Sequence, residues 1–234
     1  MRPKKRVIIY DEQVASEYDE VRFTDIKGKL FHELEMNLFK NTLFSIPLSS
    51  CVLEVGVGTG RFTAETARLE HNLHGVDISE SMIKQSIRKT NNANYYVAEG
   101  GYLPFKDKTF DFIYSIRVLN QMISKEYAIN AIEEMVRVCK TGGLILIEFV
   151  NRNSLSILAR RGIQLTLREI YGCLQSSQNI KVVKVAGVLL LSQTFMNMLP
   201  SFMLPVFKRF DNLFTKICPA IATRCYIELH KTGL

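Results

Sequence analysis

The chain has 234 residues, 47% of them hydrophobic and 23% charged, which is ordinary for a globular protein with a substantial core. After the basic residues at its start, only Val7–Ile9 form an apolar run, which is too short for the core of a signal peptide. The five cysteines are never spaced as C-x-x-C, and the four histidines show no metal-ligand spacing. We therefore expect reduced thiols, a cytoplasmic location and no metal site.

The charge is unevenly distributed along the chain. Residues 1–150 carry 19 basic and 20 acidic residues, whereas residues 151–234 carry 11 basic and only 3 acidic residues. This asymmetry predicts a division near Asn151. We expect an N-terminal helical lead-in at 1–50, an α/β core at 51–150, and a basic and apolar extension at 151–234.

The predicted elements begin with helical sequence at 11–45, where the apolar residues recur in helical register. From 51 to 150, β-type runs alternate with helical patterns, as a parallel α/β sheet requires. We expect strands at 51–55, 72–76, 94–98, 110–115 and 143–149, and helices at 60–70, 79–90 and 126–139. Ser79 is placed to cap the second of these helices, and Gly142 with Gly143 to follow the end of the third.

Beyond residue 150 the pattern predicts four more elements. A short helix is expected at 166–174, a strand at 180–191, a helix at 203–217 and a final strand at 222–229. The helix at 203–217 carries aromatic residues at helical spacing, which is typical of a core-facing side. Residues 185–207 contain no charged residue, and we consider for them a core strand with a packing helix, an apolar acceptor pocket, or a membrane-facing patch.

The first functional signal is the turn after the strand at 51–55. It contains Gly56, Gly58 and Gly60, and the acidic residue Glu54 lies two positions before the first glycine. Glycines at a strand-to-helix turn leave backbone N–H groups free to face a nucleotide-like ligand. A dinucleotide fingerprint would need its third glycine at position 61, which is occupied by Arg61.

Two more acidic residues follow at the ends of predicted strands. Asp77 comes 17 residues after Gly60, close to the interval at which a carboxylate accepts hydrogen bonds from ribose hydroxyls. Glu99 ends the run at 94–98 and precedes Gly100. The three acidic residues therefore lie where neighbouring parallel strands end, and they predict a nucleoside site there.

These features together resemble the class I S-adenosyl-L-methionine (SAM)-dependent methyltransferases, in particular the type 11 domain. The resemblance rests on five motifs in the family's order, and the segment Ala15–Asp19 is similar to the lead-in of many relatives. The motifs are Glu54–Gly60, Asp77, Glu99, Leu103–Phe105 with Phe110–Ile113, and Arg137–Gly143. The resemblance implies a Rossmann-like fold, with a mostly parallel seven-stranded sheet flanked by helices, and SAM as methyl donor.

The resemblance also implies where SAM lies. The loop from Gly56 to Gly60 would pass beneath its methionine and ribose portions, and Asp77 would hold the ribose. Ile78 and Glu99 with Gly100 would frame the adenine. Glu54 would order the loop near the amino-acid end, and Tyr18 would help to close the site.

The acceptor stays open at this level. A small-molecule or lipid-like acceptor such as a quinone precursor, with peripheral membrane contact through the C-terminal part, is the first interpretation. An RNA methyltransferase that uses the basic C-terminal part is the second, and a non-catalytic SAM-binding regulator or partner subunit is the third. Tyr114, Arg117 and Asn120 lie near the expected methyl position, and the surrounding sequence lacks the N/D-P-P-Y signature of amino-group methyltransferases. The sequence assigns no general base.

Overall fold

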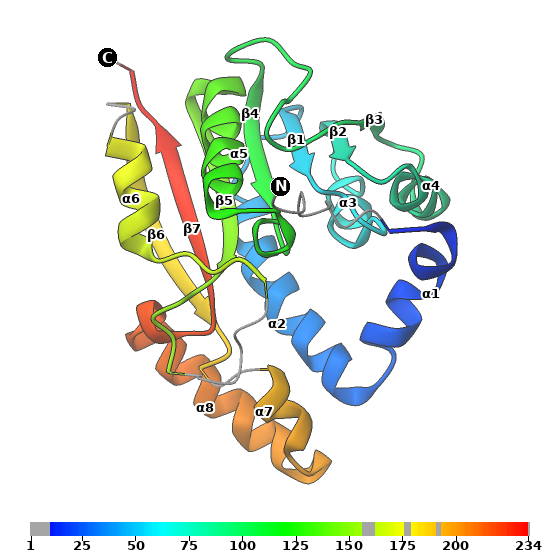
Figure 1. Cartoon of the computed structure of the whole chain (residues 1–234), viewed down its shortest axis with the longest axis vertical. Coiled ribbons are helices and arrows are strands. Elements are labelled where there is room, and N and C mark those ends of the chain that lie inside the picture. The colour runs from blue at the N-terminus through cyan, green and yellow to red at the C-terminus, as the bar shows by residue number, and fades with distance from the viewer. Residues whose placement is uncertain (1–9, 156–161, 176–178, 191–192, 234) are drawn as a thin grey trace, which may run out of the picture.

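The computed structural model describes residues 10–155, 162–175, 179–190 and 193–233. Its centre is a seven-stranded sheet in the order β3-β2-β1-β4-β5-β7-β6 (Figure 1). The strands are β1 (Cys51–Val55), β2 (Asn72–Asp77), β3 (Asn94–Val97), β4 (Phe110–Ser115), β5 (Cys139–Val150), β6 (Ile180–Val188) and β7 (Arg224–Lys231). The α-helices are α1 (Glu12–Phe23), α2 (Ile26–Leu43), α3 (Arg61–Thr66), α4 (Glu80–Lys89), α5 (Lys125–Val138), α6 (Leu167–Gln175), α7 (Gln193–Met198) and α8 (Leu204–Ile217).

Strands β1 to β5 pair in parallel, whereas β7 runs antiparallel to both β5 and β6. The carboxyl ends of β1 to β4 therefore lie along one edge of the sheet. The order of the strands reverses between β1 and β4, the point at which open α/β sheets bind ligands. The predicted fold class, including the two late strands, is confirmed.

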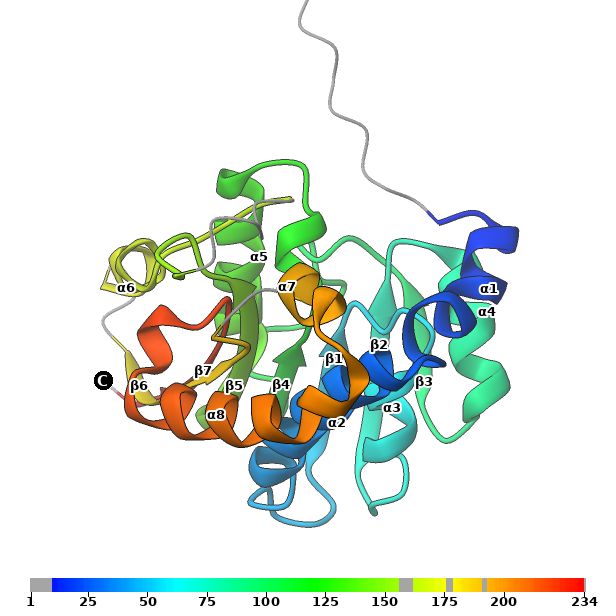
Figure 2. The same ribbon diagram turned by 90° about the horizontal axis from the view of Figure 1, so that it is seen from below.

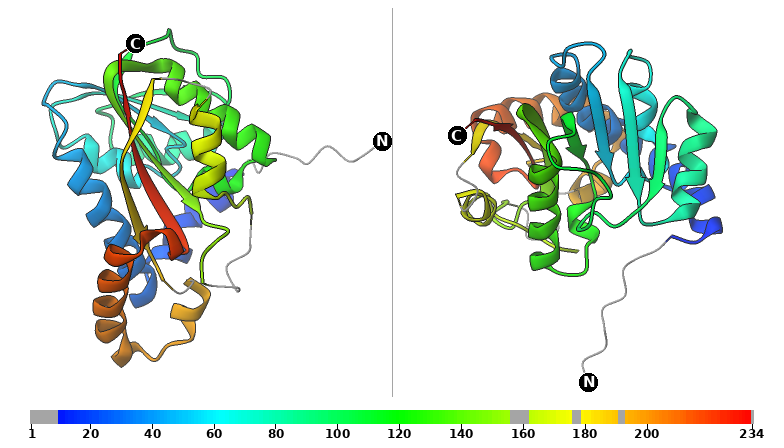
Figure 3. Two further views of the ribbon diagram at one scale, coloured as in Figure 1. Left: turned by 90° about the vertical axis from the view of Figure 1, so that its left-hand side faces the viewer. Right: turned by 90° about the horizontal axis from the view of Figure 1, so that it is seen from above.

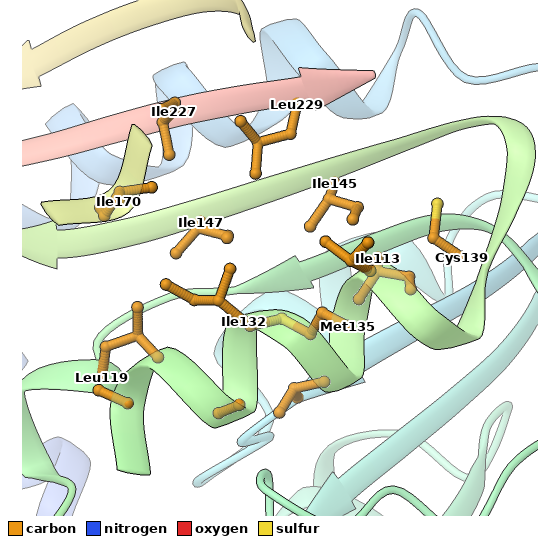
Figure 4. Packing of buried hydrophobic residues seen from close by; sticks show 14 of the residues in the cluster. Ile113, Leu119, Ile132, Met135, Cys139, Ile145, Ile147, Ile170, Ile227 and Leu229 are labelled. Atoms are coloured by element: carbon orange, nitrogen blue, oxygen red, sulfur yellow. The ribbon is translucent and has the colours of Figure 1, made fainter. Parts of the chain in front are cut away.

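Two hydrophobic cores cover the two faces of the sheet. On one face, Ile132 and Met135 of α5 pack against Ile113, Ile145 and Ile147 of β4 and β5 (Figure 4). On the other face, Phe39 of α2 packs edge-on against Phe62 of α3 and lies 4.7 Å, centroid to centroid, from the ring of Tyr114. Both faces of the central strands are thus buried, which explains their nearly continuous apolar sequences.

The helix beginnings follow the local chemistry, but one predicted helix end is wrong. Ser79 caps α4, because its side chain accepts a hydrogen bond from the N–H of Met82. In contrast, α5 ends at Val138, and Gly142 and Gly143 lie inside β5. The pairing of Cys139 with Phe110 begins the strand before the glycines, and the register shifts where they are inserted.

The C-terminal extension departs from the predicted core packing. The segment between β6 and β7 carries α7 and α8, and both helices lie at the end of the sheet where the parallel strands finish (Figures 1 and 3). Phe207 is partly buried against the second core, but Phe210 and Ile217 are 59% and 67% exposed. Helical spacing therefore identified the shared face correctly, whereas the inference that this face is buried is wrong.

The helices of the described segments are all too short or too polar to span a bilayer.

Candidate functional site

A pocket lies at the carboxyl edge of the sheet, and it is lined by segments that follow four neighbouring strands. The residues after β1, β2, β3 and β4 meet there, together with side chains from α3, α4, α5 and the N-terminal segment. This is the position expected for a ligand in an open α/β sheet. The site residues predicted from sequence that line it are Glu54, Gly56, Gly58, Asp77, Ile78, Gly100 and Tyr18.

The glycine turn has two different roles along its length. Gly56, Gly58 and Gly60 all have positive φ, a conformation that strains other residues. A side chain at Gly58 would meet no atom within 4 Å, so the loop is open towards the pocket at this point. A Cβ at Gly60 would come within 2.5 Å of Ser86 Oγ, and Gly60 is not among the lining residues. Gly60 therefore allows the start of α3 to pack closely on α4.

Asp77 lies at the end of β2 and holds the glycine turn in place. Its Oδ2 accepts a hydrogen bond from the N–H of Gly58 at 2.8 Å, and its Oδ1 accepts one from the N–H of Ser79 at 2.9 Å. Burial raises the pKa of Asp77, and the hydrogen bonds from Ser79 and Gly58 offset part of the rise. Each carboxylate oxygen has a second lone-pair direction, so both oxygens can accept a further hydrogen bond.

Glu54 lines the pocket from β1 but is only 2% exposed. Its Oε2 accepts hydrogen bonds from Thr63 Oγ1 at 2.5 Å and from Tyr114 Oη at 2.9 Å. Burial raises the pKa of Glu54 to about 8, although these two hydrogen bonds oppose the rise. The Glu54 side chain is therefore mainly a neutral carboxylic acid below a pH of about 8.

Glu99 is exposed to solvent and does not line the pocket, in contrast to Ile78 and Gly100. The hydroxyl of Tyr127 donates a hydrogen bond to Glu99 Oε2 at 2.7 Å, and it is Tyr127 that lines the pocket. Burial and the neighbouring carboxylate raise the pKa of Tyr127 to about 12. Glu99 is thus connected to the site through a phenol.

The N-terminal segment closes one side of the pocket. Tyr10 and Tyr18 both line it, and their rings pack edge to face with centroids 5.5 Å apart. The segment is fastened by a hydrogen bond from Ser79 Oγ to the carbonyl of Tyr10 at 2.9 Å and by one from the Tyr10 hydroxyl to Gln121. Sequence reasoning identified Tyr18 but missed Tyr10 and Gln121, because a contact across 111 residues leaves no local signal.

The three residues considered near the methyl position have different surroundings. Tyr114 is fully buried in β4 and bonds to Glu54, and Asn120 is not among the lining residues. Arg117 does line the pocket, together with Arg61, which sequence reasoning did not assign to the site. In the sequence, the only feature that marks Arg61 is its position, because a dinucleotide-binding loop would have its third glycine there.

Within the segments that the structure describes, no cluster of three or more His, Cys, Asp or Glu side chains is arranged to hold a metal ion.

Comparison with known proteins identifies the domain. Residues 53–147 match the family model described as a methyltransferase domain. The chain is 34% identical over 155 residues to the ubiquinone/menaquinone biosynthesis C-methyltransferase UbiE of Teredinibacter turnerae, covering 62% of this chain and 60% of that protein. It is 31% identical over 125 residues to the probable tRNA methyltransferase 9B of Mus musculus, covering 53% of this chain and 26% of that one.

A solved structure supports the same assignment at the level of the fold. Magnesium protoporphyrin IX methyltransferase from Synechocystis, crystallised with bound SAM, superposes with a TM-score of 0.63 at 14% identity. The match covers 96% of this chain and 99% of that one. The chain spans less than two thirds of the length of either curated relative. Family match, fold and pocket position agree, and residues 53–147 form a SAM-dependent methyltransferase domain with the class I fold.

Proposed function

We propose that the protein transfers a methyl group from SAM to a small-molecule or lipid-like acceptor, such as a quinone precursor. The observation that carries this proposal is the single pocket in which the glycine turn and Asp77 meet an apolar wall from the end of β4. The wall residues are Ile116, Val118, Met122 and Ile123. An apolar wall beside a polar cofactor end favours an acceptor with a large apolar part.

The residues of the cofactor end fit SAM. Asp77 retains acceptor capacity for two hydroxyl groups, and the open space above Gly58 leaves room for a ligand against the loop. In this proposal Asp77 holds the ribose, and Gly56 and Gly58 lie beneath the methionine and ribose portions. Ile78 and Gly100 frame the adenine, with Glu99 acting through Tyr127.

The remaining residues position the reactants and exclude water. When bound, SAM supplies a methyl group already activated on a sulfonium sulfur, so alignment is the main contribution required of the protein. Good alignment corresponds to effective molarities of about 10⁵–10⁸ M. Tyr10 and Tyr18 cover the pocket, and neutral Glu54 anchors α3, the helix that follows the loop, through Thr63. We assign no general base.

An RNA acceptor is the second candidate, because relatives from three species are named as tRNA methyltransferases, two of them as probable ones. RNA binding needs basic side chains that form a continuous footprint. Several cations of the extension are instead engaged within the protein. Arg224 pairs with Glu148, and Lys231 is buried and donates hydrogen bonds to the carbonyls of Val136 and Cys139. These internal roles favour the small-molecule acceptor.

Peripheral membrane contact through α7 and α8 is part of the proposal. These helices and the turn between them expose a group of apolar side chains, namely Met198, Phe202, Met203, Val206, Phe210, Leu213, Phe214 and Ile217. Figure 2 views α7 and α8 from below the sheet, on the side where the strands end. Arg209 and Lys216 are exposed on the same helix, and basic residues beside an apolar face favour anionic lipid.

The experiment uses purified protein, methyl-labelled SAM and a fractionated cell extract, with Asp77→Asn as the control. We expect label in the lipid or small-molecule fraction, and little or none with Asp77→Asn. Label in RNA would contradict the proposed acceptor class. Binding of SAM without transfer to any fraction would favour a regulatory subunit over an enzyme.

A further inference from the structure

Arg117 is a buried, fixed residue beside the apolar wall that we assign to the acceptor. It is the second residue after β4, lines the pocket and is only 9% exposed. Its φ is +66°, an unfavourable value for a residue other than glycine. The carboxylate of Glu148 accepts a hydrogen bond from its N–H at 2.7 Å, and Gln121 Nε2 donates one to its carbonyl at 2.5 Å. These two bonds hold the strained backbone and fix where the side chain begins.

The guanidinium of Arg117 uses little of its hydrogen-bonding capacity. Among the described residues, its sole hydrogen-bond acceptor is Glu35 Oε2, which lies 3.5 Å from Nη1. The guanidinium carbon is 4.7 Å from the ring centre of Phe31 and 5.7 Å from that of Phe23. A guanidinium carries five N–H donors, and no nitrogen of Arg117 is among the buried side-chain atoms that lack a partner in the described part of the chain. The remaining donors are therefore available to a ligand in the pocket.

The buried charges around Arg117 do not balance. Glu35 is shared between Arg117 and Arg61, whose Nη2 lies 3.6 Å from the same oxygen. Arg224 pairs with Glu148 at 2.5 Å. Three guanidinium groups therefore face two carboxylates, and the cluster holds one surplus positive charge.

The neighbours of the cluster leave this surplus in place. His32 lies beside Arg61, but burial lowers its pKa, so the imidazole is neutral and adds no charge. Burial also raises the pKa of Tyr10, and the positive charges of Arg22 and Arg117 offset part of that rise. Arg61 and Arg117 line the pocket together with Tyr10, so the surplus charge lies beside the pocket.

We infer that Arg117 binds a carboxylate carried by the methyl acceptor, so that the acceptor is a small apolar molecule with one anionic group. The inference rests on the proposed function, because it specifies the acceptor of the same pocket. A planar guanidinium donates two parallel hydrogen bonds to a carboxylate, and the pairing is strong where water is excluded.

A ligand with one negative charge neutralises the surplus positive charge of the cluster better than a ligand with two. SAM carries two positive groups and one carboxylate, a net charge of +1, which the single charge of Asp77 matches at the cofactor end. The surplus at Arg117 then remains for a second ligand. A carboxylate neutralises one positive charge, whereas a phosphate dianion would leave a net negative charge in a buried cluster.

The test compares benzoate with benzamide, two probes that differ in charge but share a flat apolar ring. Their affinities for protein loaded with S-adenosylhomocysteine are measured by calorimetry, for the natural chain and for Arg117→Gln and Arg117→Lys. Arg68→Leu is the control, because Arg68 is a surface arginine whose side chain is 72% exposed. Comparing the two probes on the natural chain tests the inference even if a variant does not fold.

We expect benzoate to bind the natural chain and Arg68→Leu at least about tenfold more tightly than benzamide. Arg117→Gln should remove this preference, Arg117→Lys should retain part of it, and the affinity for S-adenosylhomocysteine should stay within about twofold. Equal binding of benzoate and benzamide to the natural chain would overturn the inference.

Three other outcomes separate the remaining explanations. A loss of S-adenosylhomocysteine affinity in Arg117→Gln would assign the guanidinium to the cofactor's own carboxylate and overturn the inference. Displacement of benzoate by inorganic phosphate or a short RNA at lower concentration would overturn the choice of carboxylate. Arg117-dependent benzoate binding without any S-adenosylhomocysteine binding would support the anion site and contradict the proposed function.

Discussion

At the scale of single residues, Glu54 is a carboxyl group that the fold keeps away from water. The unfolded chain ionises it near its ordinary pKa, whereas burial raises the pKa in the folded protein to about 8. The folded state therefore binds the proton more tightly. The contribution of protonated Glu54 to the unfolding free energy is fully present below the ordinary pKa of a glutamate and is lost as the pH rises towards 8.

This linkage predicts the behaviour of Glu54→Gln. The amide oxygen can accept the hydrogen bonds from Thr63 and Tyr114, but the side chain does not titrate. Relative to the natural chain, the variant should gain on the order of 3–4 kcal/mol of unfolding free energy between pH 5 and pH 8. Urea unfolding at a series of pH values measures the difference. Parallel pH profiles for the two proteins would contradict the assigned pKa.

The glycine turn gives a second prediction at this scale, from two neighbouring alanine substitutions. Gly60→Ala places a methyl group against Ser86 and should lower the unfolding free energy by roughly 2–4 kcal/mol. Gly58→Ala meets open space, so backbone strain alone should cost about 1 kcal/mol, while SAM affinity falls because the methyl group enters the pocket. Denaturant unfolding and SAM titration of both variants check the contrast. The reverse order of stability losses would refute it.

At the scale of elements, the strands and helices of the core could be predicted because each has a strong local pattern. The end of α5 could not, since Cys139 joins the sheet through its pairing with Phe110, a contact between distant residues. The exposure of the apolar face of α8 could not be predicted from the sequence either. Periodicity identifies which side chains share a face of a helix, but whether another element covers that face depends on the whole fold.

Because this face of α8 is exposed, we predict that polar substitutions on it weaken membrane binding but hardly change the stability of the protein. The double variant Phe210→Ser and Ile217→Ser removes two exposed apolar side chains, so the unfolding free energy should change by no more than about 0.5 kcal/mol. Sedimentation with vesicles that contain anionic lipid should fall several-fold. Val21→Ser on α1 is the matched control, since Val21 is 77% exposed on a different helix.

The outcome of that experiment can also count against the proposal. Equal vesicle binding by the natural chain and the double variant would exclude α8 as the contact. A concentration-dependent dimer that the double variant abolishes would assign the face to a second copy of the chain instead.

At the scale of the whole molecule, the pocket joins the ends of four strands to an N-terminal segment. The sequence predicted the end of the pocket that the glycine turn and Asp77 line, because glycines and acidic residues at strand ends carry a local signature. Its other side is built from contacts without such a signature. Tyr10 reaches Gln121 across 111 residues, and the buried cluster at Arg117 draws Glu35 from α2 and Arg224 from β7. Such a cluster emerges only when the chain is folded.

The most direct test of the whole account is calorimetric titration of SAM into the natural chain, Asp77→Ala and Glu80→Ala. Glu80 is the control, because its side chain is 69% exposed and lies three residues away on α4. We expect one SAM to bind the natural chain and Glu80→Ala, and binding to Asp77→Ala to be weaker by about a hundredfold or more. Equal affinity of the natural chain and a folded Asp77→Ala, or no binding by the natural chain, would contradict the account.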